Sequence, residues 1–215
     1  MTTPRVPGRL ALGVGIGLAQ ALFAFTFRGP KARFWQRMTV TGLALGAYGL
    51  TTSEASRRVR IGPREIALGL ASAVAQFATF QVGDRLARRI MPAGDREIGE
   101  IYELRTLRPR GEIGARLAMI VGPAEEIFWR GTVQAGLMRL LGRWPGTAAG
   151  VAAYGGVHLV TGNLTLTGAA AVGGAHWGIL YAAGVPLGAL IVSHSLWDVW
   201  IFLLQPTQEP SPVRS

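Results

Sequence analysis

The sequence predicts an all-α protein, a polytopic bundle of about seven transmembrane helices. Of its 215 residues, 49% are hydrophobic and only 16% are charged, and the mean hydropathy is +0.31. A soluble domain would carry about 25% charged residues. The apolar residues also form long runs instead of short alternating stretches, which is typical of helices that cross a bilayer. The 30 glycines lie among Leu, Val and Ile, as expected where helices pack closely in lipid.

The net charge is +10, and basic residues form clusters between the apolar runs, within 28–37, 57–64 and 85–89. Such clusters meet anionic lipid headgroups at the ends of membrane spans. We therefore expect contact with the lipid bilayer and no nucleic-acid partner. The chain has no cysteine, which excludes disulfides, thiolate metal sites and a cysteine nucleophile.

The first apolar run follows two arginines, as a signal peptide would, but it is long and ends in phenylalanines, so we interpret it as a retained helix. Six further runs follow it, separated by charged, glycine or proline positions. The second is short and glycine-rich, and could be tilted or partly re-entrant. The expected helices are Leu10–Phe27, Met38–Thr52, Glu65–Gly83, Ile113–Trp129, Thr147–Val160, Leu164–Ala183 and Leu187–Leu204.

The segment 84–112 mixes both charge signs with a few apolar residues, and we expect a loop containing an amphipathic helix on the membrane surface. This segment divides the chain into an N-terminal membrane region, 1–112, and a helical core, 113–205. The proline-rich tail, 206–215, is predicted to be disordered.

Ionisable residues in the apolar second half of the chain form a small polar set. Asp198 is the one formally charged residue between Pro145 and Gln205, and all three histidines of the chain, His158, His176 and His194, lie in that stretch. Such groups are costly at membrane depth, so they usually face a cavity or one another.

The stretch GPAEEIFWRG, 122–131, adds two adjacent carboxylates and an arginine. Residues four apart share a helix face, so Glu126 can pair with Arg130, while Glu125 points elsewhere. Arg130 would hold Glu126 ionised, which leaves Glu125 free for chemistry. Taken alone, the pair would be a salt bridge at the end of a span.

Two further pairs have the same spacing, Tyr154 with His158 and His194 with Asp198, and each can orient an imidazole. Glu125, His158 and His194 could hold zinc or another divalent metal with an open water position. Alternatively, Glu125 and His158 could deprotonate a water while His194 and Asp198 hold the developing oxyanion. His176 has no partner at helical spacing, and its role is left open.

Three ordered motifs resemble the CPBP family of intramembrane proteases, which includes the type II CAAX prenyl endopeptidases and the Abi proteins. EEIFWR resembles the EExxxR motif of that family, YGGVH its FxxxH motif, and HSLWD its HxxxN/D motif. The resemblance covers roughly Ile113 to Leu204. It implies a helical bundle with a polar intramembrane cavity and hydrolysis of a peptide bond near the membrane.

Carried over by motif, the resemblance makes Glu125 and His158 the water-activating residues, His194 and Asp198 the oxyanion site, and Glu126 with Arg130 their support. Members are often labelled metalloproteases, although a metal-free glutamate mechanism is also proposed, and we favour the latter. Tyr154 replaces the usual phenylalanine and adds a hydroxyl. Asp198 stands where asparagine is common, and an ionised carboxylate would repel an oxyanion.

The expected substrate is a peptide or membrane protein, which the family resemblance allows to be prenylated. The expected location is the cell (inner) membrane, as a multi-pass protein. The alternative is a non-enzymatic membrane protein, a proton-coupled carrier or an immunity-type interaction protein that keeps the polar pocket. A carrier would more often show two related halves, whereas the ionisable set here lies in one half.

Overall fold

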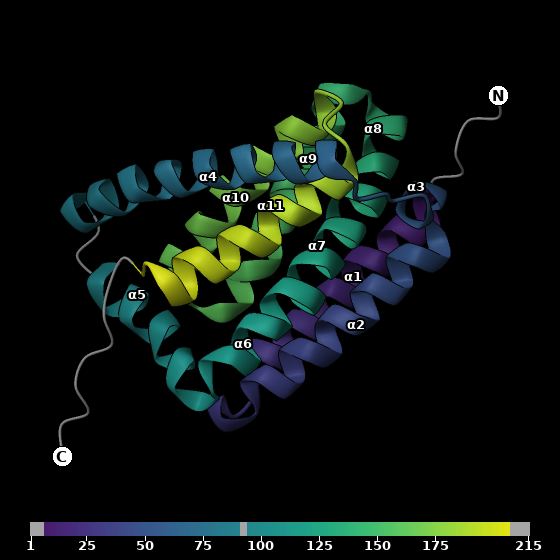
Figure 1. Cartoon of the computed structure of the whole chain (residues 1–215). Coiled ribbons are helices and arrows are strands. Elements are labelled where there is room, and N and C mark those ends of the chain that lie inside the picture. Colours follow the sequence, from purple (N-terminus) through teal and green to yellow (C-terminus); the bar gives the residue numbers. More distant parts are fainter. Residues whose placement is uncertain (1–6, 91–93, 207–215) are drawn as a thin grey trace, which may run out of the picture.

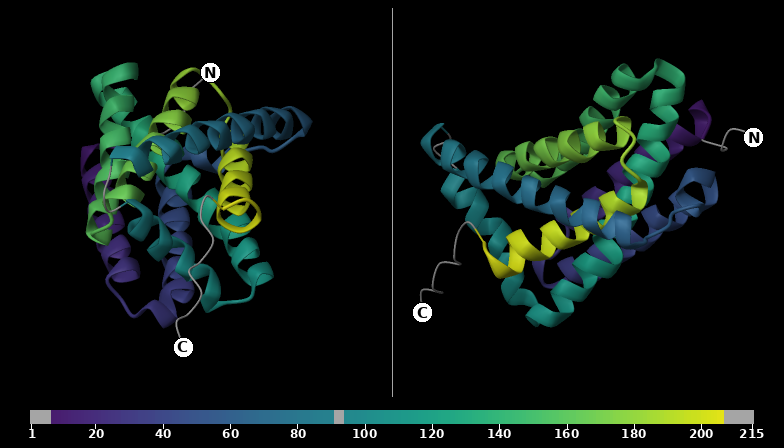
Figure 2. Two further views of the ribbon diagram at one scale, coloured as in Figure 1. Left: turned by 90° about the vertical axis from the view of Figure 1, so that its left-hand side faces the viewer. Right: turned by 45° about the horizontal axis from the view of Figure 1, so that its top comes forward.

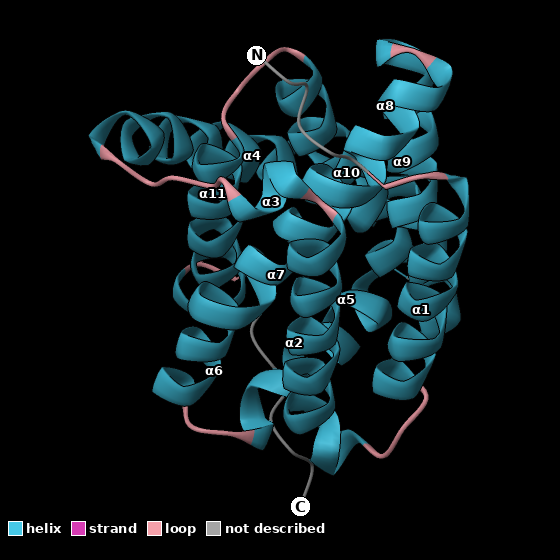
Figure 3. Ribbon diagram, turned by 90° about the vertical axis from the view of Figure 1, so that its right-hand side faces the viewer, coloured by secondary structure: helices cyan, strands magenta, loops and turns pink. Residues whose placement is uncertain are grey.

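The described part of the chain consists of helices joined by short loops and turns (Figure 1, Figure 3). The computed structural model describes residues 7–90 and 94–206, and no strand occurs among them. The all-α fold class is thus confirmed. The helices are α1 (Arg9–Phe27), α2 (Phe34–Thr52), α3 (Glu54–Arg57), α4 (Pro63–Ile90), α5 (Gly94–Glu103), α6 (Arg110–Arg116), α7 (Gly122–Phe128), α8 (Ala135–Leu141), α9 (Arg143–Val157), α10 (Leu164–Ala182) and α11 (Leu187–Val199).

Each expected membrane helix has a counterpart, and three helical segments are long and apolar enough to cross a membrane: Arg9–Phe27, Pro63–Arg85 and Leu187–Leu204. That all seven cross it stays a prediction. Three boundaries differ by four residues or more from those expected, and one of them is the start of α9, at Arg143 in place of Thr147. Helix α2 begins at Phe34, because Phe34 and Trp35 pack into the core, and it is a full helix. Helix α4 continues to Ile90, since leucine, alanine and arginine beyond Gly83 are good helix formers.

Helices α6, α7 and α8 form one continuous rod, interrupted by two π-helical turns, Leu117–Val121 and Trp129–Gln134. In the first turn the Gly122 N–H bonds to the Leu117 carbonyl, five residues earlier. Each π turn changes the direction in which the following side chains point, and such turns are frequent at functional sites. The stretch that carries Glu125 and Glu126 lies between the two turns.

Helix α7 is packed between α2 and α11 (Figure 1). Glycines allow both approaches. A Cβ on Gly49 of α2 would lie 2.8 Å from Ile127 Cγ2, and one on Gly122 would lie 2.9 Å from the Ser195 backbone nitrogen. These distances are shorter than side chains tolerate, so both helix contacts require glycine. The close packing places α7 in the interior of the bundle.

Helix α4 lies along α11 (Figure 2), and aromatic pairs join it to α11 and to the turn that follows. Phe77 stacks on Trp200 with centroids 4.4 Å apart, and the rings of Phe80 and Trp197 are 4.6 Å apart. Because α11 carries His194 and Asp198, α4 forms one wall beside the candidate site.

Helix α5 is the expected amphipathic helix, with Ile98 and Tyr102 buried, and it docks on the start of α10. Glu97 Oε2 accepts hydrogen bonds of 2.8 Å from the Thr165 N–H and 2.7 Å from its hydroxyl. The Thr165 side-chain bond is the main reason why the pKa of Glu97 is lowered from its ordinary value of 4.5. The segment expected to be disordered lies outside the described residues, apart from Pro206.

The Glu97 carboxylate should therefore stabilise the docking of α5 in a pH-dependent way. A lowered folded-state pKa means that the contribution is fully present above the ordinary pKa and is lost as the pH falls through the folded value. We predict that Glu97→Gln lowers the thermal unfolding temperature at neutral pH, and that its difference from the unmodified protein narrows below about pH 4.5. Glu100→Gln is the control, because it loses only an exposed ion pair with Arg96. A difference that stays constant down to acid pH would contradict the assignment.

Candidate active site

The two adjacent glutamates are both buried in the centre of the bundle. Glu125 is 5% exposed, Glu126 is fully buried, and Arg130 is 2% exposed. Buried charges in such surroundings must be paired and hydrogen-bonded. The two glutamates have different partners, and Glu126 Oε2 has none among the described residues.

One carboxylate oxygen of Glu126 accepts hydrogen bonds from two side chains. Its Oε1 accepts hydrogen bonds of 2.8 Å from Arg130 Nη1 and 2.8 Å from His194 Nδ1. The Arg130 pair is the one that the i,i+4 spacing predicts. The bond to His194, which joins α7 to α11, was not predicted from the sequence. Arg130 also donates to the Gly174 carbonyl at 3.3 Å, so α10 is part of the same network.

Glu125 has a separate partner, the hydroxyl of Tyr154 on α9. This hydroxyl donates to Glu125 Oε2 at 2.7 Å. The phenylalanine that is usual at this motif position could not form that bond. The guanidinium of Arg130 lies over the Tyr154 ring, 4.7 Å from its centroid, so Tyr154 contacts both halves of the polar cluster.

His158 contacts the same tyrosine as Glu125 does, with the ring centroids of His158 and Tyr154 5.0 Å apart. His158 Nδ1 is 2.8 Å from the Tyr154 carbonyl oxygen. A carbonyl can only accept, so Nδ1 carries the proton, and Nε2 of the neutral ring keeps its lone pair. His158 was expected inside a continuous helix. It instead opens a 3₁₀ turn, His158–Thr161, which ends at Gly162 with a φ of 70°.

His194 and Asp198 lie one turn apart on α11, with His194 Nε2 3.6 Å from Asp198 Oδ1. This distance is longer than a direct hydrogen bond. The Trp177 indole stacks on the His194 ring with centroids 3.9 Å apart and planes inclined by 18°. The imidazole is therefore fixed at Nδ1 by Glu126 and over its face by Trp177.

His176, the third histidine, does not join this cluster among the described contacts. Its Nε2 is 3.0 Å from the hydroxyl of Ser72 on α4. The fold brings Glu125, Glu126, Arg130, Tyr154, His158, His194 and Asp198 together and leaves His176 on the α4 side.

The metal hypothesis requires Glu125, His158 and His194 to converge on one ion. Within residues 7–90 and 94–206 no group of three or more His, Asp or Glu side chains is placed to do so. In this arrangement the three side chains do not fit a three-ligand metal site.

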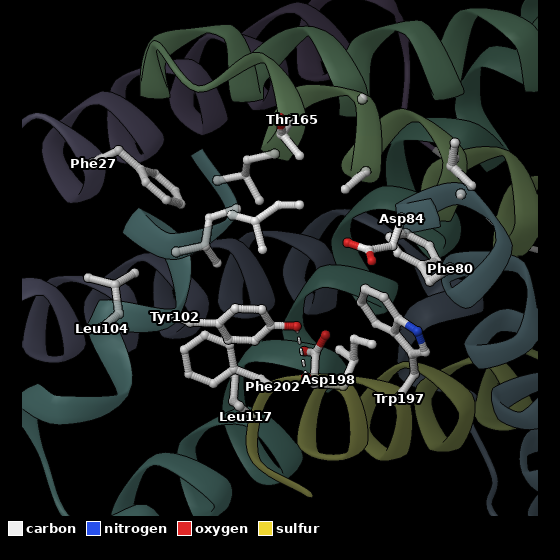
Figure 4. A pocket seen from close by; sticks show the side chains of 18 of the residues that line it. Phe27, Phe80, Asp84, Tyr102, Leu104, Leu117, Thr165, Trp197, Asp198 and Phe202 are labelled. Carbon is white, nitrogen blue, oxygen red and sulfur yellow. Dashed lines mark hydrogen bonds between the residues drawn. The ribbon is translucent and has the colours of Figure 1, made fainter. Parts of the chain in front are cut away.

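An apolar cavity of about 430 Å³ lies next to the cluster, and Asp198 is in its wall. Parts of α1, α2, α4, α5, α10 and α11 line it, and its surface is mostly aliphatic and aromatic. Figure 4 shows the carboxylates of Asp198 and Asp84 among the rings of Phe80, Trp197 and Tyr102. Asp198 thus links the cavity to His194.

The sequence predicted a polar intramembrane cavity, but it did not predict the apolar lining of this one, the Trp177 stack or the bond between Glu126 and His194. All three arise between helices that are distant in the chain, so no local spacing could indicate them. The tryptophan next to His176 was visible in the sequence, but helical periodicity gave it no partner.

The arrangement defines a helical membrane protein with a buried carboxylate and histidine site. Residues 113–200, which carry all three motifs, match the Rce1-like family, described as type II CAAX prenyl endopeptidase Rce1-like. The match agrees with the resemblance given by the motifs, and over this segment the chain is similar to the type II CAAX prenyl endopeptidases. Searches of curated proteins and of solved structures gave no match.

Proposed function

We propose that the protein is an intramembrane endopeptidase that hydrolyses a peptide bond by water activated at Glu125 and His158. The observation that carries the proposal is the separation of the two glutamates. Glu126 is bound by Arg130 and His194, whereas Glu125 has only the Tyr154 hydroxyl as a described partner and keeps Oε1 for a reactant.

In the proposed first step, Glu125 Oε1 takes a proton from a water molecule whose other proton is held by the lone pair on His158 Nε2. The water oxygen attacks the carbonyl carbon of the substrate, a C–O bond forms, and the carbonyl electron pair moves to its oxygen. When the C–N bond breaks, Glu125 returns the proton to the leaving nitrogen. Glu125 is restored, and one water is consumed for each peptide bond.

The oxyanion of this step needs a hydrogen-bond donor in a low-dielectric site. The proposed donor is Nε2 of a protonated His194, whose Nδ1–H is already committed to Glu126. Asp198, 3.6 Å from that nitrogen, then shares the proton or binds it between turnovers. This assignment gives the aspartate a use that does not require it to face the oxyanion as a bare negative charge.

The proposed substrate is a peptide of a membrane-associated protein, and the proposed location is the cell (inner) membrane, as a multi-pass protein. The cavity beside Asp198 supports a substrate with a bulky apolar group near the scissile bond, because its lining is apolar and aromatic. A prenylated CAAX-type peptide is one member of this class.

We predict that Glu125→Ala and His158→Ala each abolish peptide cleavage by the purified protein in lipid vesicles, while both variants still insert and fold. Each removes a proton-transfer group, an effect of about 10²–10⁴-fold. Glu103→Ala is the control, because its carboxylate is exposed and pairs with Lys31. Full cleavage by both site variants would disprove the catalytic assignment.

The metal-free form of the proposal is tested by chelation. We expect 1,10-phenanthroline and EDTA to leave both the cleavage rate and the thermal unfolding temperature unchanged, because no group of three His, Asp or Glu side chains among the described residues is placed to hold a metal ion. Loss of cleavage together with a lower unfolding temperature, both restored by added zinc, would instead assign Glu125, His158 and His194 to a metal ion.

A further inference from the structure

His176 is the first residue of a chain of hydrogen bonds that leaves α10, passes through α4 and α11, and returns to α10. His176 Nε2 is 3.0 Å from Ser72 Oγ on α4, which is 2.8 Å from Ser193 Oγ on α11. The Trp177 indole N–H then donates to Ser193 Oγ at 3.0 Å. The chain therefore joins three helices and returns to the residue next to its start.

The donor and acceptor chemistry fixes the direction of the first two bonds. An indole N–H can only donate, so Ser193 Oγ accepts from Trp177, and the Ser193 hydroxyl donates to Ser72 Oγ. We assign the proton of the Ser72 hydroxyl to His176 Nε2, which requires the tautomer that carries its proton on Nδ1. In this assignment His176 is the terminal acceptor, and without it the Ser72 hydroxyl loses that acceptor.

The other end of the chain lies against the candidate site. Trp177 is 1% exposed, and its indole lies flat on the His194 imidazole at a centroid distance of 3.9 Å. The bond from His194 Nδ1 to Glu126 fixes one edge of the ring but leaves it able to tilt about that bond. The stacked indole removes this freedom, so it determines where His194 Nε2 points.

The packing around the indole leaves little room for an alternative position. A Cβ on Gly173 would lie 3.1 Å from Trp177 Cζ3 and 3.2 Å from the amide nitrogen of Gln76. Gln76 itself is fully buried. The Trp177 ring is thus held between α4, α10 and His194. Its N–H is the one polar group of the ring, and the hydrogen bond of this group sets the rotation of the ring.

We propose that Trp177 is a positioning residue for His194, and that His176 positions Trp177 through Ser193 and Ser72. The inference rests on the proposed function, because it concerns the imidazole that is assigned to the oxyanion. It gives the third histidine a role without placing it in contact with substrate.

The alternative is that the chain only joins helices, as interhelical hydroxyl bonds do in many membrane bundles. Thr26 provides a matched control, because its hydroxyl makes a buried 2.8 Å bond to the Thr41 hydroxyl that joins α1 to α2 and includes no residue of the site. Thr26→Val removes a bond of the same kind. If the hydrogen-bond chain is purely structural, Thr26→Val and the substitutions of its own residues should change kcat and the thermal unfolding temperature in the same way.

The experiment compares His176→Leu, which has no acceptor, with His176→Gln, whose amide oxygen can reach the position of Nε2. We expect His176→Leu to lower kcat about tenfold with little change in KM, since small displacements of a catalytic group have effects of this size or larger. His176→Gln should recover most of kcat. Thr26→Val should lower the thermal unfolding temperature and leave kcat unchanged. Equal kcat values for His176→Leu and the unmodified protein would overturn the inference.

A second readout does not depend on cleavage. With three histidines in the chain, the ring-proton NMR signal of His194 can be assigned by its loss in His194→Gln. Stacking on Trp177 should shift this signal upfield, and the shift should disappear in Trp177→Leu, decrease in His176→Leu and persist in His176→Gln and Thr26→Val. An unshifted signal in the unmodified protein would refute the positioning role. Absence of cleavage with the shift intact would refute only the proposed function.

Discussion

The buried contact among Glu126, Arg130 and His194 is the interaction on which the rest of the site depends. One carboxylate oxygen accepts from both partners at 2.8 Å, inside a bundle where an unpaired charge would cost several kcal/mol. The contact fixes the relative positions of α7 and α11. It also occupies Glu126, so that the adjacent Glu125 has the separate surroundings that the proposed proton transfer requires.

The fold delivers this contact through close helix packing and irregular helix geometry. Glycines such as Gly49 and Gly122 let α2 and α11 approach α7 to distances that a side chain would prevent. The π turns on both sides of α7 determine the direction in which the two glutamates point. A 3₁₀ turn at the end of α9 places His158 at the site. A regular helix with larger residues would place the same motifs without bringing them together.

How much could be predicted from the sequence follows from the range of each interaction. The helices and the pairing of Glu126 with Arg130 are local, so hydropathy and i,i+4 spacing were sufficient. The bond from His194 to Glu126, the stack on Trp177 and the docking of α5 through Glu97 join distant segments. Their geometry depends on helix packing, which periodicity does not encode. The π turns were missed because they leave the helical pattern of residues nearly unchanged.

The most direct test of this division of roles is a comparison of Glu125→Gln with Glu126→Gln, in which thermal unfolding and peptide cleavage are measured on the same preparations. Both variants keep the side-chain shape and remove one negative charge. Glu125→Gln should keep the unfolding temperature and lose cleavage. Glu126→Gln should unfold at a lower temperature, because Arg130 loses its counter-charge, and should retain part of its activity. Equal loss of cleavage in both, with equal stability, would contradict the assignment of one glutamate to structure and the other to chemistry.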